Sequence, residues 1–537
     1  MSWILLLLSC DAEPVVEPPP PAELEALPAP RLLRRNALDL LGQLPDADDL
    51  DRVEADPDAV AALRADYLHD PRLNDRMVEL MGDRWHTLVD VFDIEYYDYQ
   101  LDPEQEFPFE RAVGEEPMRL FAHVIANDLP WSEVVTADYT MANEMLADIW
   151  PLDYPDGATG WQPAFYTDGR PGVGVLSTNG LWWRYTTNES NMNRSRAAAI
   201  TRLLLCEDFL ARPVTFSFDE GVVDDPVDAV HSNPYCLACH AALDPIAASM
   251  FGFWWVVLYS DIEDTSYHPE REPMGEAFLG VEPAYFGQPM DGLSELGVQV
   301  ANDPRFYSCA VEGFAESLWR RDVTLSDFET LEPIRRDFIA QGARPQALIT
   351  ALMETDIYRA GALTADASEA TDAAEHTVRM MTPSQLAAAL AQLTGFAWTW
   401  EGFDQLANDT WGYRVLAGGV DGYNVFRPQS RPGLTWALVY KRAAQGAAQR
   451  AVQTELVDGE PGQGLFQHVT LDTRPGDPAF AQELEQLHWR LYAVRADEAR
   501  LADLAALWEA VEAESDPAWA WSTVVAVMLR DPWFVTY

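Results

Sequence analysis

Three residues near the middle of the chain have the types and the spacing that are typical of covalent cofactor attachment. Residues 233–245 read Asn-Pro-Tyr-Cys-Leu-Ala-Cys-His-Ala-Ala-Leu-Asp-Pro, which places Cys236, Cys239 and His240 in a Cys-x-x-Cys-His motif. Two thiols three positions apart form thioethers with the two vinyl groups of a haem, and the adjacent histidine ligates its iron. With five cysteines and nine histidines in 537 residues, chance produces such a motif in about one chain in a thousand. The motif therefore predicts one covalent haem c with His240 as an iron ligand.

Other chemistries use parts of the same motif and remain open. Zinc would take Cys236 and Cys239, but it needs two further ligands, and the nearest other histidines are His231 and His268. The two thiols would alternatively form a disulfide or a redox pair. A thioredoxin-like pair follows a strand, whereas an acidic segment precedes this motif.

The second axial position of the iron is not fixed by the sequence. Met250 and Met290 follow the motif and are candidate metal ligands, with Met274, His231 and His268 as alternatives. A methionine ligand would raise the reduction potential and favour electron transfer. An open position would instead favour a haem oxidoreductase, and a motif without haem would favour a binding or scaffold module of an exported assembly. Electron transfer is the favoured interpretation, and an enzymatic activity is left undecided.

The charge balance limits the partners. The chain has 36 basic and 87 acidic residues, a net charge of −51. This excludes the basic footprint of a nucleic-acid-binding protein and disfavours direct binding to an anionic membrane surface. A redox partner is expected to be a protein, and a cationic one suits this surface. No phosphate-binding loop, Gly-x-Ser-x-Gly or His-Glu-x-x-His motif is present in the sequence.

The N-terminus resembles a bacterial lipoprotein signal. A short apolar run ends in Leu-Leu-Ser-Cys10, and in such signals the chain is cleaved before the cysteine, which is then acylated. No basic residue precedes the run, and the run is shorter than usual. Residues 11–30 are rich in Pro and Glu and predict an extended tether. No later stretch is apolar enough to span a bilayer, so we expect a periplasmic or cell-surface lipoprotein attached through its lipid only.

Helical spacing of apolar residues predicts a mainly α protein of multi-helix domains, with an irregular, loop-rich haem-binding segment. Leu33, Ala37, Leu40, Leu41 and Leu44 have this spacing. Further helices are expected over 59–68, 72–81, 192–210, 304–321, 326–341, 345–355, 382–394 and 478–530. The expected organisation is a signal over 1–10, a tether over 11–30, an N-terminal helical domain over 31–150, a haem-attachment region over 151–300, a companion helical domain over 301–360, a linker over 361–380 and a C-terminal helical domain over 381–537.

The two remaining cysteines are expected to pair. Assigning Cys10 to a lipid and Cys236 and Cys239 to haem leaves Cys206 and Cys309, each within an apolar helical run. Two separate buried thiols are the alternative. An oxidising compartment favours a disulfide, which would close a loop around the haem segment.

The segment around the motif resembles the planctomycete-type cytochrome c-like proteins of unknown function, which are also common in myxobacteria. These proteins have a histidine, then Asn-Pro-x-Cys-x-x-Cys-His, then Asp-Pro, and residues 231–245 have the same pattern. Further similar segments are Gly174-Val-Leu-Ser-Thr178, Asn193-Arg-Ser-Arg196, Leu205-Cys206, Asp291-Gly-Leu-Ser-Glu-Leu296, Asp303-Pro-Arg-Phe-Tyr-Ser-Cys309 and Met381-Thr-Pro-Ser-Gln-Leu386. The resemblance covers about residues 170–360, with looser flanks, and departs after Pro245, where residues 246–253 are more apolar than in the family. It implies an exported, mainly helical protein with one haem and no known substrate.

Overall fold

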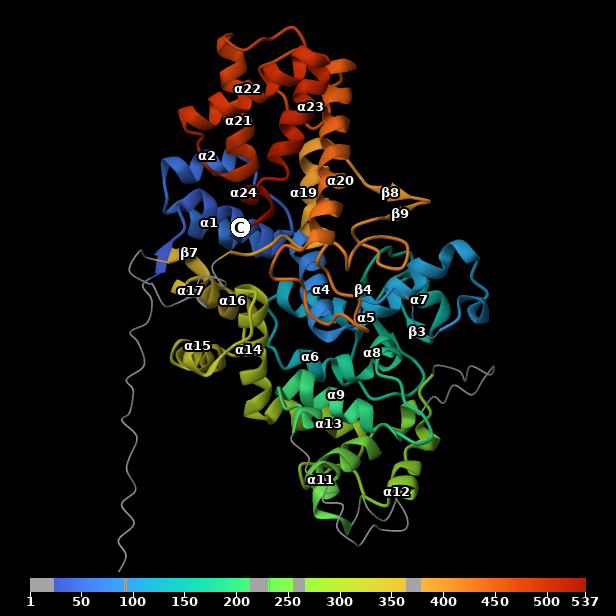
Figure 1. Ribbon diagram of the computed structural model, residues 1–537. Coiled ribbons are helices and arrows are strands. Elements are labelled where there is room, and N and C mark those ends of the chain that lie inside the picture. The colour runs from blue at the N-terminus through green and yellow to red at the C-terminus, as the bar shows by residue number, and fades with distance from the viewer. Residues whose placement is uncertain are drawn as a thin grey trace, which may run out of the picture.

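The computed structural model describes residues 24–90, 92, 94–212, 230, 232–254, 266–363 and 378–537. Within these residues the protein is mainly α, as predicted (Figure 1). Five features predicted from the sequence lie wholly or largely outside them: the signal over 1–10, the lipidation site Cys10, the tether up to residue 23, the candidate ligand His231 and most of the linker.

The first of two apolar cores is built from the N-terminal two thirds of the chain, together with Trp489 and Ala493. Its helices are α1 (Ala29–Leu41), α2 (Ala47–Ala55), α3 (Ala59–Tyr67), α4 (Arg72–Trp85), α5 (Glu106–Ala126), α6 (Glu133–Thr136), α7 (Glu144–Ile149), α8 (Asn179–Arg184), α9 (Arg194–Leu205), α11 (Pro234–Ala248), α12 (Met274–Leu279), α13 (Leu293–Asn302), α14 (Pro304–Trp319), α15 (Phe328–Ala340), α16 (Pro345–Met353) and α17 (Asp356–Arg359). Short 3-10 turns lie at Tyr96–Tyr99, Pro103–Gln105, Gly174–Ser177, Phe209–Ala211, Phe251–Phe253, Pro269–Arg271 and Leu325–Asp327.

The second core belongs to the C-terminal region, together with Leu38 of α1 and Leu44 shortly after it. Its helices are α19 (Pro383–Thr394), α20 (Leu434–Ala451), α21 (Pro478–Tyr492), α22 (Glu498–Glu514), α23 (Pro517–Met528) and α24 (Pro532–Val535), and a π-helical turn, Val452–Val457, extends α20. The N-terminal domain, haem-attachment region and companion domain expected over 31–150, 151–300 and 301–360 therefore contribute to one apolar core, and most of the other core comes from 381–537.

The strands are short and antiparallel. β1 (Leu24–Ala26) pairs with β7 (Ala360–Leu363), so the start of the described chain is tied to the end of the first core. β4 (Gln162–Tyr166) lies between β2 (Thr140–Ala142) and β3 (Leu152–Asp153). Two small hairpins pair β5 (Ala284–Tyr285) with β6 (Gln288–Pro289) and β8 (Thr399–Trp400) with β9 (Phe403–Asp404).

The long central helix α5 was not among the helices expected from the sequence, and Pro117 lies inside it. Proline has no N–H to donate to the carbonyl of Val113, four residues earlier, so a break is expected at this point. Gly180 of α8 instead packs on that carbonyl, where a Cβ atom would lie 1.9 Å from the oxygen. The Gly180 N–H also donates to Glu116 Oε2 at 2.9 Å. A neighbouring glycine therefore covers the backbone that the proline exposes.

A buried carboxylate connects the two cores. Asp39 on α1 pairs with Arg379 at 3.0 Å, and the side chains of both residues are at most 2% exposed. The hydroxyl of Tyr537 donates to Asp39 Oδ1 at 2.8 Å, and that of Tyr358 donates to Oδ2 at 3.1 Å. The second core is thereby joined through α1 to the end of the first core and to the C-terminus.

Two buried arginines of α1 strengthen the same junction. Arg34 Nη2 donates to the carbonyl of Phe534 at 2.6 Å, and Arg35 Nη1 donates to that of Ala360 at 2.8 Å. Burial, together with the nearby positive charge of Arg379, lowers the pKa of Arg35 to about 9. These guanidinium groups are stabilised by backbone carbonyls, which satisfy donors that would otherwise be costly to bury.

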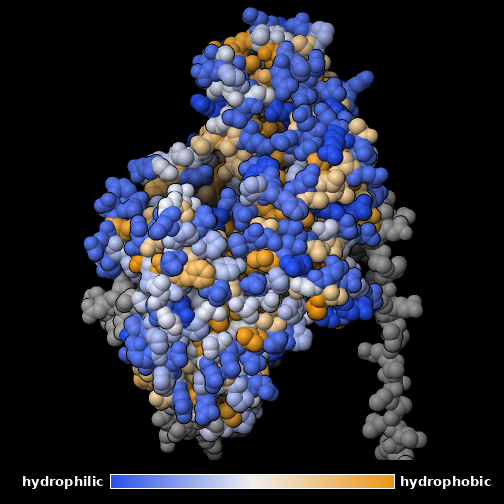
Figure 2. All heavy atoms as spheres, turned by 180° about the vertical axis from the view of Figure 1, so that it is seen from behind, coloured by the Kyte–Doolittle hydropathy of each residue, from blue (hydrophilic) through white to orange (hydrophobic). Residues whose placement is uncertain are grey.

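Most residues on the face shown in Figure 2 are hydrophilic, as expected for a chain with a net charge of −51. In the part of the chain that the structure describes, no helix is both long and apolar enough to cross a membrane.

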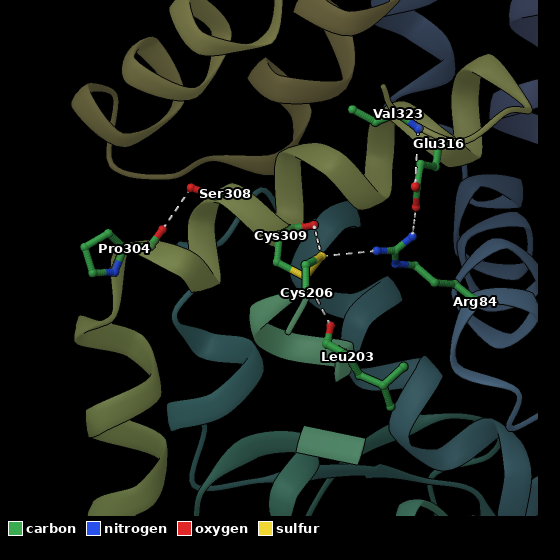
Figure 3. Close-up of a disulfide and its surroundings, with 8 residues drawn as sticks. All are labelled: Arg84, Leu203, Cys206, Pro304, Ser308, Cys309, Glu316 and Val323. Carbon is green, nitrogen blue, oxygen red and sulfur yellow. Dashed lines mark hydrogen bonds and ion pairs between the residues drawn. A yellow bond between two sulfur atoms is a disulfide. The ribbon is translucent and has the colours of Figure 1, made fainter. Parts of the chain in front are cut away.

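A disulfide joins Cys206, which follows α9, to Cys309 on α14, the pair expected from the sequence. Their Cα atoms are 5.2 Å apart. Arg84 of α4 donates to Cys206 Sγ at 3.6 Å and forms an ion pair with Glu316 of α14 (Figure 3). The bond thus fixes α9 to α14 at a place where α4 also contacts both.

We expect Asp39→Asn to lower the free energy of unfolding by about 3 kcal/mol, because it leaves the buried guanidinium of Arg379 without a counter-charge. Urea denaturation measures the change. The control is Asp322→Asn, which breaks an exposed ion pair with Arg427 and should cost less than about 1 kcal/mol. Equal losses in the two variants would contradict the role given to Asp39.

Replacing both Cys206 and Cys309 with serine should reduce stability by up to about 4.7 kcal/mol, because the disulfide closes a loop of 103 residues in the unfolded chain. The midpoint of urea unfolding without reductant measures this loss. Adding reductant to the wild-type protein should produce the same shift. A double variant as stable as the oxidised wild type would show that the disulfide contributes nothing.

Candidate haem-attachment site

The Cys-x-x-Cys-His motif lies on a helix and not in the irregular segment that was expected. The side chain of Asn233 caps α11 by accepting from the backbone N–H of Tyr235 at 2.9 Å, and Pro234 occupies the first turn. Asparagine before proline is a typical helix start, because it satisfies a free N–H and sets the first backbone angle. The sequence therefore contained the signal for this helix.

The two halves of α11 have different surroundings. Leu243, Ile246 and Ala247 are buried in the first core, and they anchor the C-terminal half of the helix. Cys236 and Cys239 lie in the other half and are partly exposed. In Figure 1 the helix lies at the end of the molecule opposite the C-terminal helices. The motif is thus presented near the surface by a helix whose other half is fixed.

Helix geometry places the three motif side chains on one side of α11. Cys236, Cys239 and His240 occupy positions i, i+3 and i+4, which are neighbours on a helix surface. Cys236 and Cys239 are not bonded to each other. The thiol of Cys239 points to the carbonyl of Phe209 at a distance of 3.9 Å. The arrangement places two separate thiols beside one imidazole.

His240 is oriented by a buried carboxylate. Its Nδ1 atom lies 2.9 Å from Asp244 Oδ1, one helical turn further along α11. The side chain of Asp244 is 1% exposed and also accepts from Arg194 of α9, with Nε at 2.7 Å and Nη2 at 3.0 Å. A histidine whose Nδ1–H donates to a carboxylate has its Nε2 lone pair available to a metal.

The charge state of Asp244 follows from these contacts. Burial raises the pKa of its carboxyl, but the hydrogen bonds from His240 and Arg194 together outweigh burial, and the pKa lies below its usual range. Asp244 is therefore an ionised acceptor at neutral pH, as the orientation of His240 requires.

The structure gives the surroundings of the other candidate ligands. Met250 is fully buried in the first core, beyond the C-terminal end of α11, and Met290 is also a core residue that is 7% exposed. The Nδ1 atom of His268 contacts Glu270 Oε1 at 3.1 Å. Both methionines pack in the first core of this structure.

The alternative zinc site has no support in the described residues. Nowhere in the ranges that the structure describes do three His, Cys, Asp or Glu side chains converge in a way that would hold a metal ion. Zinc needs such convergence because its ligands lie within about 2.3 Å of one ion. Thioether attachment of a haem does not need three converging ligands, because the two thiols bond to the edge of the porphyrin and only the imidazole reaches its iron.

Fold and site together define a mainly α protein with a Cys-x-x-Cys-His motif on a helix. Residues 37–152 match the family described as PSD4, protein of unknown function (DUF1592). This segment runs from α1 to β3, precedes the residues 170–360 in which the resemblance was expected to be strongest, and contains no cysteine. No curated protein and no solved structure matches the chain.

Asp244→Asn should lower the free energy of unfolding at pH 7 by about 3 kcal/mol, because it leaves Arg194 without its buried partner. The folded-state pKa of Asp244 lies below its unfolded value, so its stabilisation is complete above pH about 4 and is lost as the pH falls further. Urea denaturation of the apo-protein at pH 7 and pH 3 measures the difference between wild type and variant. A difference that does not shrink at pH 3 would contradict the assignment.

Proposed function

We propose that this chain is an exported c-type cytochrome-like protein that holds one covalent haem and transfers single electrons. Cys236 and Cys239 would hold the porphyrin, and His240 would ligate the iron. The observation that carries the proposal is the contact of His240 with Asp244, because it leaves Nε2 as the free ring nitrogen beside the two thiols. A bound haem would supply a one-electron couple between ferric and ferrous iron.

The residues around the motif have separate tasks in this proposal. Asp244 accepts a hydrogen bond from the Nδ1–H group of His240. This contact fixes the tautomer of the imidazole and raises the basicity of its Nε2 atom. Arg194 keeps Asp244 ionised and connects α11 to α9. Arg212 Nη1 donates to the carbonyl of Ala238 at 2.9 Å, which ties the turn between the two cysteines to the segment after α9.

Export is supported by the disulfide between Cys206 and Cys309, because disulfides persist in oxidising compartments. We propose that the protein is a lipoprotein of the periplasm or cell surface, anchored to the membrane through Cys10 only. The net charge of −51 favours a cationic protein as redox partner, and neither nucleic acid nor direct membrane binding fits it.

Protein exported by a host that matures c-type cytochromes should show a haem spectrum that changes reversibly on reduction and that stays with the chain after denaturation. Cys236→Ser with Cys239→Ser should abolish the bound haem. The control is Cys206→Ser with Cys309→Ser, which removes the disulfide and leaves the motif intact, so the haem should stay attached. A colourless wild-type protein from such a host would contradict the proposal and favour a haem-free scaffold. Substrate turnover at the iron would instead make the protein an oxidoreductase.

The proposed lipid anchor at Cys10 is tested separately. Full-length protein should be recovered in the membrane fraction with a mass that corresponds to cleavage before Cys10 and acylation of that residue. Cys10→Ser should release the protein into the soluble fraction. A soluble wild-type protein that retains Met1 would contradict the lipoprotein assignment while leaving the haem proposal untouched.

A further inference from the structure

The C-terminal region contains a cavity of about 220 Å³ that is partly open to solvent and that nothing in the haem proposal uses. It lies between α19 and the segment that follows, which forms the β8–β9 hairpin. The small side chains of Ala387, Ala388 and Ala391 line it on the helix side, and Phe396, Trp398 and Asp404 are also among its lining residues. The cavity is smaller than the 300–1,000 Å³ that is typical of pockets for larger ligands, so it suits a small molecule.

The aromatic walls are held in place by contacts outside the cavity. The rings of Trp398 and Tyr413 have centroids 5.2 Å apart. The backbone N–H of Gln405 donates to the carbonyl of Trp398 at 2.8 Å, and that of Tyr413 donates to Gln405 at 2.7 Å. Phe396 lies so close to α20 that a Cβ atom at Gly446 would be 2.5 Å from its ring. The walls are therefore preorganised, which reduces the cost of binding.

The charge of the residues that line the cavity indicates which kind of ligand it binds. Asp404 is the ionisable residue of the lining, and no lysine or arginine of the described chain lines the cavity. Asp404 Oδ1 accepts from the backbone N–H groups of Leu406 at 2.7 Å and Ala407 at 2.9 Å, which fixes the orientation of the carboxylate. An anion would be repelled by this carboxylate and by the net charge of −51. A neutral apolar molecule would form no charge interaction with the carboxylate.

We propose that this cavity binds a small organic cation with an apolar body, of the quaternary ammonium class. The positive charge would lie against the faces of Trp398 and Phe396, where aromatic rings attract cations, and close to the carboxylate of Asp404. The alkyl groups would fill the space that the alanines of α19 leave. Binding at this place is independent of the haem motif, which belongs to the other core.

Calorimetric titration of the full chain with choline tests the proposal, with 3,3-dimethylbutan-1-ol as its uncharged analogue of the same shape. Choline should bind to one site, and the uncharged analogue should bind about ten-fold more weakly or not at all. Asp404→Asn should weaken choline binding about ten-fold. Ala388→Leu, which fills the cavity with an apolar side chain, should abolish binding.

The matched control is Asp421→Asn. Asp421 also accepts backbone N–H groups in a turn, from Tyr423 at 2.8 Å and Asn424 at 2.7 Å, but it does not line the cavity. This variant carries the same change of charge and should bind choline like the wild type. Absence of choline binding would overturn the proposal. Equal affinity for the uncharged analogue, or equal effects of the two aspartate variants, would overturn the assignment of a cation site.

Discussion

The buried ion pair between Asp39 and Arg379 is the interaction on which the arrangement of the chain depends most. A carboxylate at this depth is tolerated only where its charge is compensated, and here Arg379, Tyr358 and Tyr537 supply the charge and the hydrogen bonds. Tyr358 belongs to the end of the first core, Arg379 lies at the start of the C-terminal region, and Tyr537 is the C-terminal residue. Helix α1 therefore gains its partners only when distant parts of the chain have come together. Apolar contacts alone would allow several relative positions of two cores, whereas a paired buried charge allows few.

A second buried carboxylate has the same role on a smaller scale at the candidate site. Asp244 links α11 to α9 through Arg194, and the residue that follows α9 is bonded through its disulfide to α14. His240 is thus held by a chain of connections that runs into the first core: imidazole, carboxylate, guanidinium, helix and disulfide. The motif is partly exposed, as attachment of a large group requires, and its supporting residues are buried. The accessible motif therefore has rigid support behind it.

Much of the fold could be predicted from the sequence, and the parts that could not be predicted have physical causes. The mainly α class and helices such as α3, α4 and α14 follow from apolar periodicity, and the partner of Cys206 followed from assigning the other cysteines. Helix α5 was not among the expected helices. Pro117 is locally unfavourable in it, and the packing of the distant Gly180 on the carbonyl of Val113 is not visible in any local pattern.

The site was predictable in part. Asp244 stands four residues after His240, so a helical motif would have pointed to it, and Asn233-Pro234 was the signal for that helix. Arg194, which lies 50 residues earlier, gave no such signal because no local pattern relates two helices. The cavity beside Trp398 depends on three alanines that read in the sequence as ordinary helix formers.

The central claim is that Cys236 and Cys239 carry a haem, and the mass of the peptide that contains them tests it most directly. Protein from a host that matures c-type cytochromes would be treated with an alkylating reagent and then digested, and the fragment around residues 233–245 would be weighed. The account predicts a fragment that is heavier by one haem and that has no alkylated thiol. A fragment of unmodified mass plus two alkyl groups would show that both thiols are free and would contradict it.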